Sequence, residues 1–260
     1  MNLEADHGLL KEATREAGAL ALRYFRNRPE QWTKGKGDPV SEADIAVDTL
    51  LKTRLRDARP DYGWLSEETE DDAVRLGQDV LWIVDPIDGT RAFLEERPEF
   101  TVATSLVVGG RPVAGCVFNP ATDEFFDAWK GGGARLNDRT ITVSGRADFE
   151  DARLLASARM IKRTIDGMTS RPATYDAVNS VAYRMALVAC GCFDATLSLG
   201  PKSDWDLAGA DIIVAEAGGC CGTAKGETYI YNLESARHPT LAAANPALHD
   251  ALIDLVTRLD

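Results

Sequence analysis

The chain has 260 residues, which is enough to bury a sizeable core in one large α/β domain or in two tightly joined halves. It carries 41 acidic and 29 basic residues, and the resulting formal charge of −12 argues against nucleic-acid partners and against binding to an anionic membrane. No apolar run is long enough to span a bilayer. The five cysteines are an odd number in a chain without a signal peptide, so we expect reduced thiols and a cytoplasmic protein.

The first half of the chain predicts two helices and then a run of strands. Apolar residues at helical spacing indicate an amphipathic helix from Leu9 to Phe25. A second helix should begin after Ser41, a good N-cap, because Asp44 stands at the acidic position of a capping box. Strands are predicted in the ranges 81–84, 100–108, 112–118 and 124–129, with a hairpin turn at residues 109–110 between the middle two.

The second half predicts alternating strands and helices, which is the pattern of an α/β fold. The composition becomes polar around residues 146–151, so we divide the chain there into residues 1–147 and 148–260 and expect one compact unit. Strands are predicted in the ranges 154–157, 194–199 and 241–244, and helices in the ranges 180–188, 207–217 and 246–259.

Cysteine and histidine are not expected to carry the chemistry. The pairs Cys190/Cys192 and Cys220/Cys221 resemble a soft-metal site, but apolar neighbours favour small core residues over ligands. Only three histidines occur, and none stands next to an acidic motif in the sequence. Zinc chemistry and histidine acid-base chemistry are therefore not expected.

The most informative segment ends a buried strand in two carboxylates. Pro86 biases Asp85 toward extended backbone, so the chain can bring Asp85, the Ile87 carbonyl and Asp88 toward one point. Ligands that are all oxygen suit a hard cation such as Mg²⁺. In isolation, an Asp-Pro turn followed by a helix-capping Asp88 is the better explanation of the same residues.

Polar groups in other segments extend this site. Gly89 and Thr90 offer backbone N–H groups and a hydroxyl to a phosphate oxygen at the start of a helix. Glu67 ends a short apolar strand, and Asp206 follows Trp205 near the start of a helix. Each acid also has a structural explanation, as a solvated glutamate or as an aspartate that compensates the helix dipole. Lys34 and Lys36 either add positive charge at the mouth of the site or belong to a solvated loop.

Five motifs in this order resemble the inositol monophosphatase family, which comprises magnesium-dependent, lithium-sensitive phosphatases related to fructose-1,6-bisphosphatase. Each motif is weak alone, but the combination is specific. They occupy residues 38–44, 66–68, 85–90, 205–209 and 216–219. The resemblance implies an α/β (α+β) sandwich of alternating helix and sheet layers, with metals at the junction of the two halves, and a homodimer.

The resemblance also implies a role for each site residue. Two Mg²⁺ ions, replaceable by Mn²⁺, would be bound by Glu67, Asp85, the Ile87 carbonyl, Asp88 and Asp206. The substrate phosphate would be held by Asp88, Gly89, Thr90 and Asp206. The catalytic residues would be Asp44, Glu67 and Thr90, which orient the attacking water and help to deprotonate it. The metals would clamp the attacking and leaving oxygens, and no covalent intermediate is expected.

The substrate is expected to be a small phosphorylated metabolite. Inositol phosphatases commonly place a glutamate where this chain has Leu199, and they usually have glycine where it has Ser66. The segments 99–102 and 199–201 resemble bacterial 3'(2'),5'-bisphosphate nucleotidases instead. Adenosine 3',5'-bisphosphate and inositol monophosphate are therefore almost equally favoured as the expected substrate, with histidinol phosphate and fructose 1,6-bisphosphate as alternatives. An alternative of another class is a non-catalytic metal-binding interaction protein.

Overall fold

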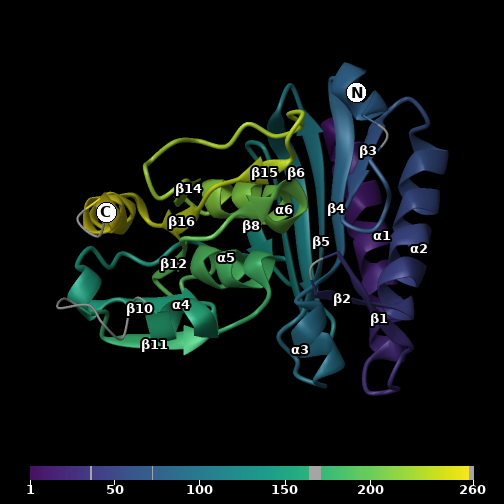
Figure 1. The fold of residues 1–260 in the computed structure, drawn as a ribbon. Coiled ribbons are helices and arrows are strands. Elements are labelled where there is room, and N and C mark those ends of the chain that lie inside the picture. The colour runs from purple at the N-terminus through teal and green to yellow at the C-terminus, as the bar shows by residue number, and fades with distance from the viewer. Residues whose placement is uncertain (36, 72, 164–170, 258–260) are drawn as a thin grey trace.

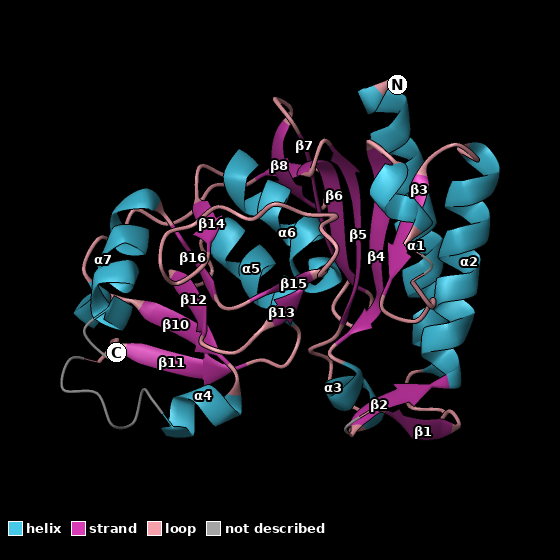
Figure 2. Ribbon diagram, turned by 45° about the horizontal axis from the view of Figure 1, so that its top comes forward, coloured by secondary structure: helices cyan, strands magenta, loops and turns pink. Residues whose placement is uncertain are grey.

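The computed structural model describes residues 1–35, 37–71, 73–163 and 171–257 (Figure 1). This part of the chain stacks five layers: a helix pair, a seven-stranded sheet, a second helix pair, a five-stranded sheet and an outer helix (Figure 2). The alternation of helix and sheet layers confirms the predicted sandwich. Within the described ranges, no helix has both the length and the apolar content needed to cross a bilayer.

The seven-stranded sheet has its strands in chain order and is antiparallel except for the first pair, β3 and β4. Its strands are β3 (Gly63–Ser66), β4 (Val80–Asp88), β5 (Thr101–Val108), β6 (Arg111–Asn119), β7 (Glu124–Trp129), β8 (Gly133–Leu136) and β9 (Arg139–Thr140). Helices α1 (Leu3–Tyr24) and α2 (Glu42–Ala58) cover one face, and α6 (Asp204–Glu216) covers the other beside α5 (Val181–Ala189).

The five-stranded sheet lies beyond α5 and α6, and α7 (Pro246–Thr257) covers its outer face (Figure 1). Its order is β11 (Thr174–Ala177), β10 (Arg153–Ala156), β12 (Ala195–Ser198), β16 (Leu241–Ala244) and β14 (Cys220–Gly222). Two small ribbons complete the strands: β1 (Gln31–Lys34) with β2 (Asp38–Ser41), and β13 (Lys202–Ser203) with β15 (Arg237–His238). Short helices are α3 (Thr90–Leu94), α4 (Ala158–Arg163) and 3₁₀ turns at Val74–Gly77 and Phe149–Asp151.

The predicted long elements are present, and their ends differ for identifiable reasons. Strands β7 and β16 have the predicted bounds. Helix α1 begins at Leu3 instead of Leu9, because the Ala5 N–H donates to the Asn2 side chain at 3.2 Å and caps a polar first turn. Helix α6 begins at Asp204 instead of Leu207, because Ser203 and Asp206 form a capping box that the prediction did not use. The predicted end of the last helix, Leu259, lies outside the described residues, and so does Lys36.

The sequence did not predict eight short strands, which have two to four residues each and no alternation long enough to recognise: β1, β2, β8, β9, β11, β13, β14 and β15. The chain leaves the seven-stranded sheet at Thr140 and enters the five-stranded sheet at Arg153. A division into residues 1–147 and 148–260 stays a prediction.

Two glycines allow α6 to lie directly on the seven-stranded sheet. A Cβ atom at Gly115 in β6 would lie 2.2 Å from the Gly209 carbonyl oxygen, and a Cβ at Gly209 would lie 2.8 Å from the Thr104 carbonyl oxygen. Both separations are far below van der Waals contact, so only glycine permits this approach. The close contact holds the helix whose first turn contains Asp206 against the sheet that contains Asp85 and Asp88.

The expectation that the cysteines are core residues is correct only in part. Cys116 is buried, Cys192 is exposed, and Cys190, Cys220 and Cys221 are half-buried. Cys190 packs against the edge of the core, and its thiol donates to the sulfur of the exposed Cys192 at 2.9 Å. The five thiols are free.

Candidate metal and phosphate site

Three aspartates from distant parts of the chain meet at the edge of the large sheet. Asp85 and Asp88 stand at the end of β4, and Asp206 stands in the first turn of α6. One carboxylate oxygen from each lies within 4.8 Å of the others, and no other triad of potential ligands meets in this way among the described residues. The pairing of β4 with β5 shifts register between Asp85 and Asp88, which redirects side chains at the strand end. This cluster could hold a metal ion.

Asp85 is the least satisfied group of the cluster. Its side chain is 1% exposed, and neither carboxylate oxygen has a hydrogen-bond partner among the described residues. Burial, followed by the nearby charges of Glu67 and Asp88, raises the pKa of Asp85 well above its ordinary value. A buried carboxylate without partners is costly, and a divalent cation is the kind of group that compensates it. The donor set therefore fits a hard cation.

The other two aspartates are oriented by backbone and hydroxyl donors. Asp88 Oδ2 accepts hydrogen bonds from Ser180 Oγ and from the Ala182 N–H, both at 2.6 Å, at the start of α5. Asp206 Oδ2 accepts from the Ser203 N–H at 2.6 Å. Burial and the charge of Asp88 raise the pKa of Asp206 to about 7. Both side chains are therefore fixed in direction while their negative charges stay close together.

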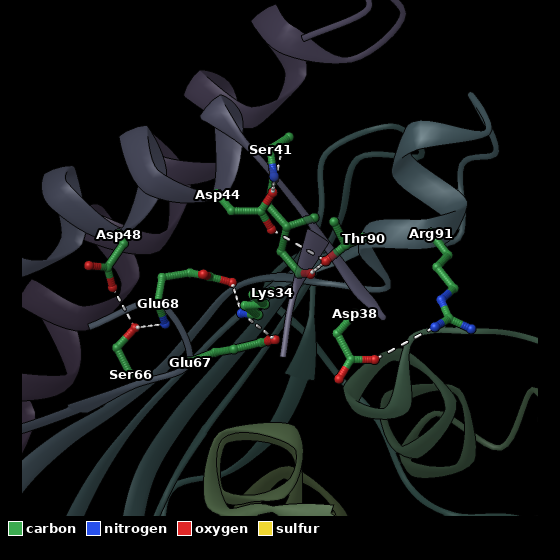
Figure 3. A network of polar contacts seen from close by, with 11 residues as sticks. Lys34, Asp38, Ser41, Asp44, Asp48, Ser66, Glu67, Glu68, Thr90 and Arg91 are labelled. Atoms are coloured by element: carbon green, nitrogen blue, oxygen red, sulfur yellow. Dashed lines mark hydrogen bonds and ion pairs between the residues drawn. The ribbon is translucent and has the colours of Figure 1, made fainter. Parts of the chain in front are cut away.

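Glu67 lines the same cleft, but its carboxylate forms an ion pair with a lysine. Its Oε1 lies 3.0 Å from Lys34 Nζ, which also lies 2.5 Å from Glu68 Oε1 (Figure 3). Burial raises the pKa of Glu68 to about 7. Glu67 is thus not part of the group within 4.8 Å, and its carboxylate would have to leave Lys34 to bind a metal.

Thr90, the first residue of α3, contacts Asp44. Its hydroxyl lies within hydrogen-bonding distance of two acceptors, Asp44 Oδ1 at 3.3 Å and the Ile87 carbonyl oxygen at 3.0 Å (Figure 3). Asp44 Oδ2 also accepts from the Ser41 N–H and hydroxyl, so the predicted capping box is present together with the contact to Thr90. Burial raises the pKa of Asp44. The structural and catalytic interpretations of Asp44 are therefore compatible.

Gly89 begins the short helix α3 in a conformation that only glycine adopts easily. Its φ is +94°, and a Cβ atom there would lie 3.0 Å from the Glu99 carbonyl oxygen. The absence of a side chain therefore lets this turn lie close to Glu99 and Ser180, and Gly89 itself lines the cleft described below.

All but one of the predicted site residues line one cleft of about 450 Å³: Glu67, Asp85, Ile87, Asp88, Gly89, Thr90 and Asp206. Asp44 is not among the lining residues and contacts the cleft through Thr90. Three cations that the sequence analysis did not assign also line this cleft: Arg91, Arg159 and Lys202. Lys202 stands four positions before Asp206. This closeness to a predicted ligand was the one feature of the sequence that could have indicated that Lys202 lies at the cleft.

The sequence also did not indicate two buried residues near the aspartate cluster, Arg184 and His238. Arg184 is 1% exposed, and its Nε and Nη1 have no hydrogen-bond partner among the described residues. Its burial lowers its pKa to about 10, opposed by the charges of Asp88 and Asp206. His238 lies far from the motifs in sequence, yet its Nε2 is 2.8 Å from Asp204 Oδ1, two residues before Asp206.

Comparison with known proteins agrees with this geometry. The sequence pattern described as "Inositol monophosphatase family" matches residues 4–259. The chain belongs to the inositol monophosphatase family. It is therefore a phosphatase of that family, acting on phosphoric monoesters.

Relatives with similar sequences and structures cover most of the chain. Inositol monophosphatase 1 from Solanum lycopersicum is 30% identical over 97% of this chain and 95% of its own length. A Nus factor SuhB from Xylella fastidiosa is 32% identical over 81% of this chain and 79% of its own. The structure of an inositol monophosphatase from Thermotoga maritima has a TM-score of 0.84 at 28% identity and covers 95% of both chains.

Proposed function

We propose that the cleft hydrolyses a small phosphate monoester with Mg²⁺ bound by Asp85, Asp88 and Asp206. The observation that carries this proposal is the buried Asp85 carboxylate, which has no hydrogen-bond partner among the described residues and lies beside two carboxylates already fixed in direction. Glu67 would join the ligands after it separates from Lys34.

We assign some residues of the cleft to binding the metal and the phosphate, and others to accepting a proton. Bound Mg²⁺ would supply Lewis-acid stabilisation and lower the pKa of a water molecule. Gly89 and Thr90 bind the phosphate at the start of α3, where both residues line the cleft. Asp44 holds the Thr90 hydroxyl in place, and the acidic Asp44 and Glu67 accept the proton of the attacking water.

Two substrate classes follow from different observations. The names of the family relatives support an inositol monophosphate type of substrate. The comparisons give the bisphosphate-nucleotide alternative no separate support, whereas Leu199 and the cations of the cleft favour a substrate with more negative charge. Histidinol phosphate and fructose 1,6-bisphosphate remain alternatives, and a homodimer remains a prediction.

Phosphate release from a panel of esters tests the proposal. Metal-stripped protein should release no phosphate from inositol 1-phosphate, adenosine 3',5'-bisphosphate, histidinol phosphate or fructose 1,6-bisphosphate, and addition of Mg²⁺ or Mn²⁺ should start turnover of at least one. Asp85→Asn should abolish this turnover. Asp123→Asn removes a carboxylate at an exposed turn residue and is the matched control, which should keep it. Absence of release from every ester would overturn the proposal, and metal binding without turnover would favour the non-catalytic interaction protein.

A further inference from the structure

A second hollow opens beside the acidic cleft and has the opposite charge. It is a cavity of about 580 Å³, and Arg159 and Lys202 line both it and the acidic cleft. The remaining lining residues are hydroxyl or apolar, and none of the described residues that line it is a carboxylate. We refer to this cavity, around Arg159, Leu199 and Lys202, as the cationic hollow.

The two cations of the hollow are the half-buried Lys202 and the exposed Arg159. Within the described part of the chain, no Asp or Glu forms an ion pair with Arg159 or Lys202. Lys202 Nζ donates only to the Pro201 carbonyl oxygen, at 3.1 Å. Burial lowers the pKa of Lys202, opposed by the charges of Asp206 and Asp88, which means that its charge has lost part of its hydration. In a chain with a net charge of −12, a hollow lined by two cations and by no described carboxylate is a local region of positive charge that attracts an anionic group.

The position of the hollow identifies which part of a substrate would reach it. Lys202 belongs to β13 and Arg159 to α4, and both side chains lie where the cationic hollow joins the cleft containing Asp85, Asp88 and Asp206. An ester that places its reacting phosphate on the aspartate cluster can therefore extend the rest of the molecule toward Arg159 and Lys202. At the position where the family commonly has a glutamate, Leu199 contributes no negative charge to this hollow.

We propose that Arg159 and Lys202 form a subsite for a second anionic group, so that the preferred substrates are phosphate monoesters carrying an additional phosphate or carboxylate. This inference rests on the proposed function, because it assigns the leaving-group side of the same cleft. Guanidinium and ammonium groups bind phosphate through charge-assisted hydrogen bonds, which are the strong ones in a partly desolvated pocket. Contacts to a remote group of the substrate strengthen binding without touching the reacting atoms.

Matched pairs of esters test the subsite. Adenosine 3',5'-bisphosphate is compared with adenosine 3'-monophosphate, and fructose 1,6-bisphosphate with fructose 1-phosphate, so that each pair differs by one phosphate. For at least one pair, kcat/KM of the wild-type protein should favour the bisphosphate by about tenfold or more, which is the scale of one hydrogen bond to a charged group. The preference should appear mainly in KM, because binding to a remote group changes KM more than kcat.

Variants of the two cations separate this subsite from a role in binding the reacting phosphate. Arg159→Gln and Lys202→Gln should each remove most of the preference while changing kcat/KM for the monophosphate less than about threefold, and Arg159→Lys should retain it. Lys130→Gln, at an exposed lysine in the turn after β7, is the control for loss of one positive charge. Equal kcat/KM for both members of both pairs, or variants that lower both members equally, would overturn the proposal.

Failure of the subsite and failure of the proposed function give different results. Turnover without a preference for the bisphosphate would overturn the subsite and leave the proposed function standing. If no ester releases phosphate, the proposed function fails, and calorimetric titration of the same pairs in Mg²⁺ then decides the subsite by itself. Tighter binding of the bisphosphate that is lost in Arg159→Gln would support it, and equal binding of both members would overturn it.

Discussion

Ser180 Oγ donates a hydrogen bond of 2.6 Å to Asp88 Oδ2 across 92 positions of the chain. Asp88 ends β4 of the large sheet, and Ser180 is the N-cap of α5. The Ala182 N–H donates to the same oxygen at 2.6 Å. The start of α5 therefore sets the direction of one carboxylate of the acidic cluster.

Replacing Ser180 by alanine should weaken both the fold and metal binding. The Tyr183 N–H loses its cap acceptor and Asp88 loses a donor, so we expect a loss of about 1–2 kcal/mol in the free energy of unfolding. Urea unfolding measures this loss, and titration of metal-free protein with Mg²⁺ should show weaker binding. Ser180→Thr keeps the hydroxyl and is the matched control. Unchanged Mg²⁺ affinity in the alanine variant would show that Asp88 does not depend on this bond.

Asp85→Asn should nearly abolish turnover and leave the fold intact. The substitution removes a buried negative charge for which the described residues provide no hydrogen-bond partner, so the thermal midpoint in EDTA should rise relative to that of the wild-type protein. Addition of Mg²⁺ should then raise the midpoint of the variant much less than that of the wild-type protein. Scanning calorimetry with and without metal measures both effects. Full activity of the variant would refute the assignment of Asp85 as a ligand.

Metal-free protein should lose stability as the pH rises from about 4 to about 7. Burial raises the pKa of Asp206 and of Glu68 to about 7, so these acids hold protons in the folded chain that they release in the unfolded chain. A raised carboxyl pKa makes deprotonation oppose folding, and the loss is complete above pH 7. The midpoint in EDTA should therefore be higher at pH 6 than at pH 8, and Mg²⁺ should raise it more at pH 8. Asp206→Asn should flatten the profile, and a midpoint that is higher at pH 8 in EDTA would contradict this account.

Gly115→Ala should disturb the site from a distance. The new Cβ would lie 2.2 Å from the Gly209 carbonyl oxygen, so α6 must move away from β6, at a cost of about 2–3 kcal/mol in the free energy of unfolding. Urea unfolding checks the stability, and a lower Mg²⁺ affinity should accompany it because Asp206 moves with α6. Gly8→Ala in α1 is the control: no atom lies within 4 Å of its added Cβ, and alanine favours a helix. A neutral Gly115→Ala would mean that α6 and the sheet do not need this approach.

The sequence predicted the parts of the site that follow local rules. Pro86 restricts the backbone of Asp85, so the sequence itself indicates a change of chain direction where this strand ends. Ser41 and Asp44 at the start of α2 have the spacing of a capping box. Both features depend on neighbours within a few residues, so they are visible without the fold.

The supporting groups could not be predicted because they depend on packing between layers. Ser180 and Arg184 belong to a buried helix, and only the stacking of α5 on the sheet brings them to Asp88. Lys34 ends a strand with no recognisable alternation, so its pairing with Glu67 had no signal in the sequence. Arg159 and Lys202 come from a short helix and a two-residue strand that periodicity does not detect.

A crystal of the protein soaked in Mn²⁺ and phosphate tests the central claim most directly. An anomalous difference map should show Mn²⁺ at about 2.1–2.4 Å from carboxylate oxygens of Asp85, Asp88 and Asp206, with phosphate against Gly89 and Thr90. The same soak of Asp85→Asn crystals should show the peak weakened or lost. Absence of a metal peak among these three carboxylates in the wild-type protein at saturating Mn²⁺ would contradict the account.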